Sequence, residues 1–263
     1  MGLDDVKQVL LVLSGKGGVG KSSLAAQLAL TLSINGKKVG ILDTDICGPS
    51  IPRIFNAIHA KVVANEQGQW VPVSTVNGIK LFSLGFLMPE GNLDAAIIWR
   101  GPKKTAMIGQ MLNKVEWGDL DYLIVDTPPG TSDEHLALVN DLFSLPQRKS
   151  STKAVIVTTP QLVALSDVER EISFCKSVDL GIVGVVENMS GWTCSKCQHQ
   201  VNLFSSGGGA QLADKYGLPL LGTLPIDSGL AKLFDEGVCD LTDYESCSSA
   251  SLMLPIVQKL DNL

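Results

Sequence analysis

Residues 8–23 read QVLLVLSGKGGVGKSS, and the rest of the chain can be interpreted outward from them. The apolar run from Val9 to Leu13 breaks at a glycine-rich turn, and a helix-compatible segment begins near Gly20. The turn fits the pattern G-x-x-x-x-G-K-S/T, in which backbone N–H groups surround an anion at a helix N-terminus. The sequence therefore predicts an ATP site formed by Gly15, Lys16, Gly17, Gly18, Val19, Gly20, Lys21, Ser22 and Ser23.

Two lysines in this turn have different predicted roles. Lys21 can reach the β- and γ-phosphates, and the Ser22 hydroxyl suits Mg²⁺. The general pattern does not require Lys16. The string GKGGVGKSS resembles the deviant phosphate loop of the MinD-like ATPases (SIMIBI class), whose extra lysine reaches the nucleotide of the partner subunit. The resemblance implies catalytic roles for Lys16 and Lys21 and ATP-dependent dimerisation; a solvated loop lysine is the alternative for Lys16.

Apolar runs alternate with helix-compatible segments along most of the chain. Because each run is apolar throughout, we expect an α/β fold with a doubly wound, mainly parallel sheet flanked by helices, as one P-loop ATPase domain over 1–263. Residues 61–86 depart from this alternation, and the turn signal Asn77-Gly78 predicts an antiparallel excursion at the sheet edge. Strands are predicted at 38–42, 122–125, 153–159, 182–186 and 218–222, helices at 20–33, 99–115, 161–178, 208–216 and twice near the C-terminus, and polar loops at 144–152 and 190–209.

Composition and charge argue against several classes of protein. The net charge of −6 is not gathered in long blocks, which disfavours a nucleic-acid partner. No run of eighteen apolar residues predicts a membrane span, and the N-terminus resembles neither a signal nor a transit peptide. The six cysteines then point to the reducing cytosol, where paired cysteines usually serve metal or redox chemistry.

Acidic residues follow two of the predicted strands, where ligands of parallel sheets bind. Asp126 matches the second acidic motif of P-loop ATPases, which holds Mg²⁺, usually through water; a helix N-cap is the alternative. The following DTPPGT resembles the family's second switch segment, in which the Gly130 N–H could sense the γ-phosphate. Asp43 and Asp45 share a face of an extended chain. The resemblance makes Asp45 the water-positioning residue and Asp43 a magnesium-side residue, with solvated turn aspartates as the alternative.

Asn188 ends another predicted strand at the same sheet edge. The segment ENMSG matches the adenine-contacting segment of the resembled family, and a side-chain amide can pair with the donor–acceptor edge of adenine. The alternative is an Asx turn. The resemblance therefore adds Asn188 to the predicted ATP site.

Cys194 and Cys197 form a C-x-x-C pair in the polar loop at about 190–209. A thiolate site for zinc or an iron–sulfur cluster normally needs four protein ligands, and no second C-x-x-C exists. Two chains would therefore share one site across a two-fold axis. A bridging [4Fe–4S] cluster is favoured over half a zinc knuckle and over a redox C-x-x-C. His199 stays open as a further ligand; Cys175 is expected in the core, and Cys47, Cys239 and Cys247 are expected to be structural or exposed.

Several separate motifs together resemble the Mrp-type iron–sulfur cluster carrier ATPases, over about residues 8–236. They are GKGGVGKSS, DTDICGPSIPR, WRGPKK, DYLIVDTPPGTSDEH, VTTPQ, VENMSGWTCSKC and the GGG that follows. The stretch before the first strand lacks the four-cysteine motif of the longer cytosolic paralogue, so the chain is most similar to the short, Cfd-type group. Some relatives have further cysteines shortly after the C-x-x-C, where Gln198, His199 and Gln200 stand here.

This resemblance implies a cytosolic ATP-dependent scaffold that carries a labile [4Fe–4S] cluster between two protomers. It implies slow ATP hydrolysis with Mg²⁺, and homodimers or heterotetramers with the longer paralogue. Downstream targeting factors and apo-proteins would receive the cluster. The alternatives are a zinc-bridged P-loop ATPase and a membrane-positioning ATPase of the MinD type. The latter needs a basic amphipathic C-terminal helix, but residues 248–263 contain Lys259 as their one basic residue, together with Pro255.

Overall fold

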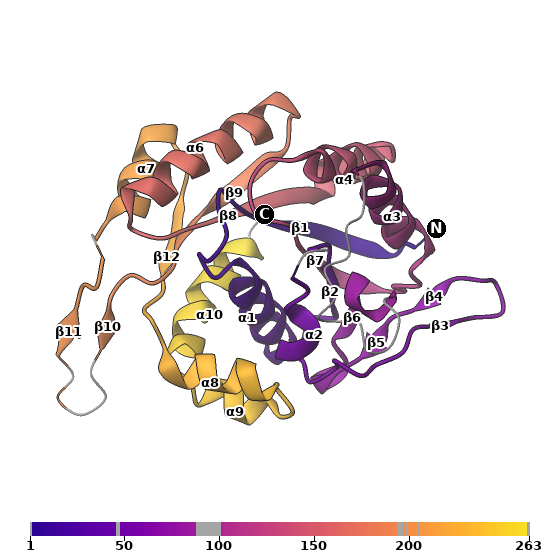
Figure 1. Ribbon diagram of the computed structural model, residues 1–263, viewed down its shortest axis with the longest axis horizontal. Coiled ribbons are helices and arrows are strands. Elements are labelled where there is room, and N and C mark those ends of the chain that lie inside the picture. Colours follow the sequence, from indigo (N-terminus) through magenta and orange to yellow (C-terminus); the bar gives the residue numbers. More distant parts are fainter. Residues whose placement is uncertain are drawn as a thin grey trace.

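The computed structural model describes residues 2–45, 48–87, 101–193, 197, 199–204 and 206–261. Within these residues an eight-stranded sheet forms the centre of the molecule (Figure 1). Its strands are, in spatial order, β12 (Leu220–Thr223), β9 (Gly181–Glu187), β8 (Thr152–Thr158), β1 (Val6–Ser14), β7 (Leu120–Asp126), β2 (Val39–Asp43), β6 (Lys80–Ser83) and β5 (Val73–Ser74). Every neighbouring pair is parallel except β5 with β6. The predicted doubly wound, mainly parallel sheet is confirmed.

Helices cover both faces of this sheet (Figure 1). Helices packed on one face are α1 (Lys21–Ile34), α2 (Ile51–Ile54), α8 (Ser228–Glu236), α9 (Leu241–Glu245) and α10 (Ser248–Leu260). The other face carries α3 (Gly101–Lys114), α4 (Asp133–Phe143), α5 (Pro146–Ser151), α6 (Leu162–Ser177) and α7 (Gly208–Tyr216). Two short hairpins lie outside the main sheet: β3 (Val63–Ala64) with β4 (Trp70–Val71), and β10 (Trp192–Thr193) with β11 (Gln200–Val201).

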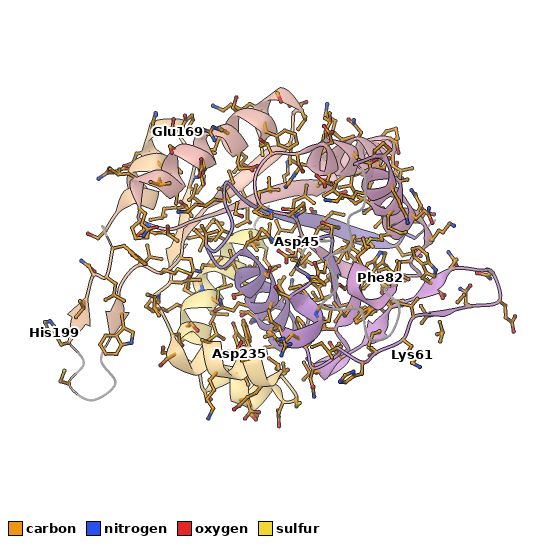
Figure 2. The ribbon with its side chains drawn as sticks, viewed as in Figure 1. Asp45, Lys61, Phe82, Glu169, His199 and Asp235 are labelled. Atoms are coloured by element: carbon orange, nitrogen blue, oxygen red, sulfur yellow. The ribbon has the colours of Figure 1, made fainter. Side chains whose placement is uncertain are left out.

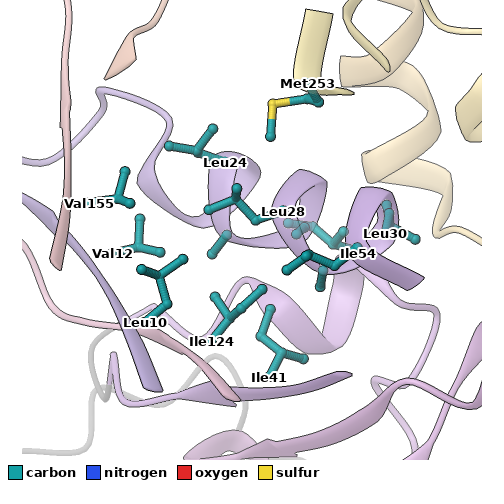
Figure 3. Close-up of a cluster of buried hydrophobic side chains, with 14 of the residues drawn as sticks. Leu10, Val12, Leu24, Leu28, Leu30, Ile41, Ile54, Ile124, Val155 and Met253 are labelled. Carbon is teal, nitrogen blue, oxygen red and sulfur yellow. The ribbon is translucent and has the colours of Figure 1, made fainter. Parts of the chain in front are cut away.

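Strand β1 lies in the middle of the sheet and divides its side chains between the two hydrophobic cores. Leu10 and Val12 pack under α1 and α10, in the cluster that Figure 3 shows with Leu24, Leu28 and Met253. The alternating residues Val9, Leu11 and Leu13 face α3 and α4 instead. Because successive side chains of a strand point to opposite faces, a run that is apolar at every position is buried on both sides. This burial holds the glycine-rich turn at the end of β1 in a rigid place.

The segment 61–86 contains the predicted antiparallel strands at the sheet edge, but one of its strands also joins the main parallel sheet. Strand β3 is antiparallel to β4, and β5 is antiparallel to β6, whereas β6 also pairs in parallel with β2 and extends the main sheet. The turn signal at Asn77-Gly78 is observed as a short 3₁₀ turn, Val76–Gly78, between β5 and β6. A local turn signal predicts the hairpin but carries no information on which distant strand the second arm will join.

The predicted polar loop 144–152 is wrong, because this segment contains α5. Its Arg148 is buried, and its guanidinium donates hydrogen bonds to the backbone carbonyls of Leu3, Asp4 and Val6. The polar character of α5 therefore satisfies the backbone at the entry to β1 and does not mark a solvated connection. Helix α4, just before it, was also absent from the sequence-based prediction.

Glu171 on α6 predicts a pH-dependent stability. Its side chain is fully buried, neither carboxyl oxygen has a hydrogen-bond partner among the described residues, and burial raises the pKa of Glu171 to about 7. The folded chain therefore binds an extra proton between the ordinary carboxyl range and pH 7, so stability falls as pH rises through that window. The loss is about 3 kcal/mol when completed above pH 7.

We expect Glu171→Gln to remove this part of the pH dependence and to be more stable than the wild type at pH 8. Urea unfolding at pH 5 and pH 8 measures the difference directly. The control is Glu169→Gln on the same helix, since Glu169 is partly exposed and ion-paired with Lys215. Equal pH slopes in the wild type and the Glu171 variant would contradict the buried, proton-binding carboxyl.

Candidate functional site

The carboxyl ends of β1, β2 and β7 meet at one edge of the sheet and form a small cavity at the N-terminus of α1. Its volume is about 280 Å³. Helix α1 begins at Lys21 because Gly20 has a left-handed φ of 83°, which turns the chain into the helix without a side-chain penalty. The residues lining the cavity include the predicted Lys16, Gly17, Gly18, Gly20, Lys21, Ser22, Ser23 and Asp45, joined by Ser14, Ser50, Ile54 and Pro129.

Two residues of the predicted phosphate loop have supporting places instead. A Cβ atom at Gly15 would lie 2.4 Å from the backbone carbon of Asp167, so the missing side chain allows α6 to pack against the loop. Val19 is buried in the core under α1, and its carbonyl accepts a hydrogen bond from the Asn188 amide. The loop is thereby held between α6 and the end of β9.

A buried ion pair lies at the inner end of the cavity. The Lys21 Nζ is 2.5 Å from Asp126 Oδ1, and the two side chains are 7% and 0% exposed. Burial raises the pKa of Asp126, and the Lys21 charge and hydrogen bond oppose that rise. Asp126 Oδ2 has no hydrogen-bond partner within the described part of the chain. A buried carboxylate oxygen without a partner is available to a cation or to water.

Asp43 lies beside Asp126 in the register of β2 and β7, but it does not line the cavity. It is fully buried, and burial followed by the neighbouring Asp126 raises its pKa well above the ordinary carboxyl range. Its Oδ2 accepts from the Ser83 hydroxyl and its Oδ1 from the Asp45 N–H, each at 3.1 Å. Asp43 therefore holds the start of the Asp45 segment. Asp45 itself lines the cavity, as the sequence predicts.

The second switch segment differs in one detail from the expectation. The Gly130 N–H donates to the Ser14 carbonyl at 2.8 Å, so in this conformation it is not turned toward a phosphate. The Thr127 hydroxyl likewise donates to the Val12 carbonyl at 2.8 Å. These two bonds hold the segment after β7 against the end of β1.

A larger cleft of about 1050 Å³ continues from the cavity along α1. Asn188 and Met189 line it, as do Gly20, Ser23 and the segment 224–227 after β12. Asn188 Nδ2 donates to the Val19 carbonyl at 2.9 Å, which leaves its Oδ1 as an acceptor. A Cβ at Gly20 would lie 2.2 Å from Asn188 Nδ2, so only glycine allows this approach. The segment 224–227 was not among the predicted site residues; its position after a predicted strand that ends at the same sheet edge was the available signal.

We define residues 190–209 as the cysteine segment; its described strands β10 and β11 project from the body of the molecule (Figure 1). Strands β10 and β11 form a short antiparallel hairpin within it, where the sequence predicted a loop. Cys197 and His199 are exposed, and Cys194 lies outside the described residues. Figure 2 shows His199 far out on this projection and Asp45 in the middle of the molecule. In the part of the chain that the structure describes, no three His, Cys, Asp or Glu side chains gather as a metal site.

Among the remaining cysteines that the structure describes, none lines the phosphate cavity or the larger cleft. Cys175 is buried in the core as predicted, and burial raises the pKa of its thiol to about 12. Cys239 is exposed, Cys247 is half-buried, and the predicted environment of Cys47 falls outside the described residues. None of the described helices is both long and apolar enough to cross a membrane.

Comparison with known proteins identifies the family of this chain. The sequence profile described as ParA, NUBPL iron-transfer P-loop NTPase, matches residues 5–261. The chain belongs to the NUBPL iron-transfer P-loop NTPase family. This membership confirms the sequence-based resemblance to iron–sulfur carrier ATPases.

The chain is also similar to individual named proteins over most of its length. The cytosolic Fe-S cluster assembly factor CFD1 of Kluyveromyces lactis is 52% identical, covering 89% of this chain and 82% of the relative. The cytosolic Fe-S cluster assembly factor NUBP2 of Bos taurus is 48% identical over 98% of this chain and 93% of its own length. A nucleotide-binding protein of Archaeoglobus fulgidus, solved with ADP, is 39% identical with a TM-score of 0.76, covering 89% of this chain and 88% of that chain.

Proposed function

We propose that this NUBPL family member is a cytosolic, ATP-dependent scaffold that holds a labile [4Fe–4S] cluster on Cys194 and Cys197 and passes it to apo-proteins. The observation that carries the proposal is that the nucleotide cleft and the cysteine segment are adjacent along the chain. The C-x-x-C segment begins two residues after Asn188, which lines the nucleotide cleft. The names of the CFD1 and NUBP2 relatives, both cytosolic Fe-S cluster assembly factors, support the cargo and the compartment.

The cluster is proposed to bridge two protomers. Two thiolates from one chain complete only half of a four-ligand cluster site. Exposed apolar side chains follow the C-x-x-C on the same segment: Val201, Leu203 and Phe204. Three exposed apolar residues on the same segment as the exposed Cys197 favour a protein surface as the neighbour. We therefore propose a homodimer, or a heterotetramer with the longer four-cysteine paralogue, with targeting factors and apo-proteins as recipients.

The phosphate cavity supports slow ATP hydrolysis by the residues predicted for it. The unpartnered Asp126 Oδ2 and the Ser22 hydroxyl fit Mg²⁺, which would neutralise charge on the β- and γ-phosphates. Lys21 is paired with Asp126 in this conformation, and a phosphate is the stronger competitor for its ammonium. Nucleotide binding would then release Asp126. Asp45 faces the same cavity and would orient the attacking water, while Lys16 would act on the partner's nucleotide.

A membrane-positioning role of the MinD type is disfavoured by the packing of α10. Its Met253, Ile256, Val257 and Leu260 are buried in the core beneath α1. The Lys259 ammonium donates to the Leu220 and Leu221 carbonyls at 3.1 and 2.8 Å. This helix therefore buries most of its apolar face and bonds its one basic residue within the protein; Leu252 and Leu254 are exposed, but no basic side chain of the helix is left to bind an anionic lipid surface.

Anaerobic reconstitution with iron and sulfide tests the proposal. We expect one [4Fe–4S] cluster per dimer by iron and sulfide analysis and Mössbauer spectroscopy. We also expect a mass that shifts from monomer to dimer when cluster or ATP is bound. If the protein instead binds zinc tightly and contains no sulfide, the scaffold proposal is wrong and the zinc-bridged ATPase is favoured. A cluster on a monomer would overturn the bridging site.

A further inference from the structure

Both ends of the cysteine segment converge on one buried carboxylate. Glu187, the last residue of β9, is 1% exposed. Its Oε1 accepts a hydrogen bond from the Ser190 hydroxyl at 2.6 Å, and its Oε2 accepts from the Gly209 N–H at 2.5 Å. The chain leaves the body of the protein through Ser190 and returns at Gly209, in the first turn of α7. The Glu187 side chain therefore connects the two ends of the cysteine segment.

The contact between Glu187 and α7 is close. A Cβ atom at Gly209 would lie 2.8 Å from Glu187 Cβ, so the helix can reach the carboxylate only because Gly209 has no side chain. The positive end of the α7 dipole adds to the attraction. Hydrogen bonds to a charged acceptor are about twice as strong as neutral ones, and loss of the acceptor would leave buried donors unpaired. Removing the carboxylate should therefore release both ends together.

The same strand end also forms the wall of the nucleotide cleft. The Glu187 carbonyl accepts from the Leu224 N–H at 2.8 Å, and the Leu224 carbonyl accepts from the Ser190 N–H at 2.9 Å. The Ile226 N–H donates to the Gly191 carbonyl at 2.8 Å. Leu224 and Ile226 line the cleft, as does Asn188, the next residue after Glu187. The residues that would contact a bound nucleotide are thus hydrogen-bonded to the residues that begin the cysteine segment.

We propose that Glu187 is a positioning residue that couples occupation of the nucleotide cleft to the conformation of the cysteine segment. A nucleotide that contacts Asn188 and the segment 224–227 favours one position of the end of β9. Because Glu187 is hydrogen-bonded to both ends of the cysteine segment, a shift of β9 moves both ends together. Coupling of this kind requires only that the ligand bind one arrangement better than the other. The biological meaning of the coupling, control of cluster release, rests on the proposed function; the coupling itself does not.

Hydrogen–deuterium exchange on the full chain without cluster tests this route. Peptides covering 14–23 report nucleotide binding, and peptides covering 190–209 report the cysteine segment, each with and without a non-hydrolysable ATP analogue and Mg²⁺. In the wild type we expect exchange in 190–209 to change about fivefold on nucleotide binding. Glu187→Gln places an NH₂ group against one of the two donors. It should keep the response of 14–23 and lose that of 190–209.

Two further variants keep the test decisive. Ser190→Ala removes one of the two bonds without removing a buried charge, and it should reduce the response of 190–209 even if the Glu187 variant is unstable. Glu169→Gln is the control, because the Glu169–Lys215 pair, at 2.7 Å, ties the same α7 to α6 at the surface. It should leave the response unchanged.

The proposal is overturned by any of three results. The first is a wild-type cysteine segment that does not respond to nucleotide. The second is a full response in both the Glu187 and the Ser190 variants. The third is a Glu187 variant in which 190–209 exchanges faster than in the wild type by the same factor with and without nucleotide. Glu187 would then stabilise the segment without coupling it to the nucleotide. None of these depends on cluster binding, so failure here is separate from failure of the scaffold function.

Discussion

Anaerobic reconstitution of the Cys194→Ala, Cys197→Ala double variant is expected to yield a protein without cluster absorbance and without sulfide. Each protomer contributes two thiolates to the proposed bridging site, so the double variant leaves the dimer with none. Cys197 is exposed, and substitutions at exposed positions usually change stability by no more than about 0.5 kcal/mol. The variant should therefore fold, bind nucleotide and show the wild-type circular dichroism spectrum.

The matched control for this variant is Cys239→Ser, Cys247→Ser. It removes the same number of thiols from positions outside the cysteine segment, one exposed and one half-buried. We expect it to retain the full cluster content. If instead the Cys194 and Cys197 double variant keeps wild-type absorbance, the cluster is held elsewhere, and the bridging site on the hairpin is wrong.

The second large effect is expected for Lys16→Ala. Lys16 and Lys21 both line the phosphate cavity, but only Lys21 is paired with the buried Asp126. A cation supplied by a partner subunit to a phosphoryl-transfer site accelerates hydrolysis by about 10³-fold or more. Loss of Lys16 should therefore lower ATP hydrolysis by about 10³-fold and abolish the ATP-dependent increase in mass, while ATP binding is retained.

Lys21→Ala provides the contrast. It removes the lysine that lies inside each chain's own site, so ATP binding itself should be lost together with hydrolysis. Fluorescent-nucleotide titration, phosphate release and light scattering separate the two cases. A Lys16 variant that hydrolyses ATP at the wild-type rate, or that still dimerises with ATP, would remove the basis for assigning Lys16 to the partner's nucleotide.

The phosphate loop could be predicted from sequence because its residues are consecutive. A strand, a glycine-rich turn and a helix start need only local preferences, and the stretch 8–23 contains all of them. The position of Asp126 could also be predicted, since parallel strands place their carboxyl ends at one edge. The same rule brought Asp43 to that edge. It could not show that Asp43 stays out of the cavity lining and accepts a hydrogen bond from Ser83 on β6, a strand whose parallel pairing with β2 was not predicted.

Other parts of the site depended on distant pairings. The Gly130 N–H was expected to sense the γ-phosphate, but it donates to the Ser14 carbonyl of a strand more than a hundred residues earlier. Arg148 stood in a segment that composition marked as a loop, yet it is buried against the carbonyls of the N-terminal residues. In each case the partner is a backbone group, and backbone groups leave no trace in a sequence pattern.

The sequence was enough to identify a P-loop NTPase with a two-cysteine segment, because each motif is short and its chemistry belongs to neighbouring residues. The tertiary structure alone decided how the motifs are joined. It brought Gly209 to Glu187, Asn188 to Val19, and Ile226 to Gly191, through hydrogen bonds between residues far apart along the chain. Such contacts are set by how strands and helices pack, and packing is a property of the whole core that no local pattern contains.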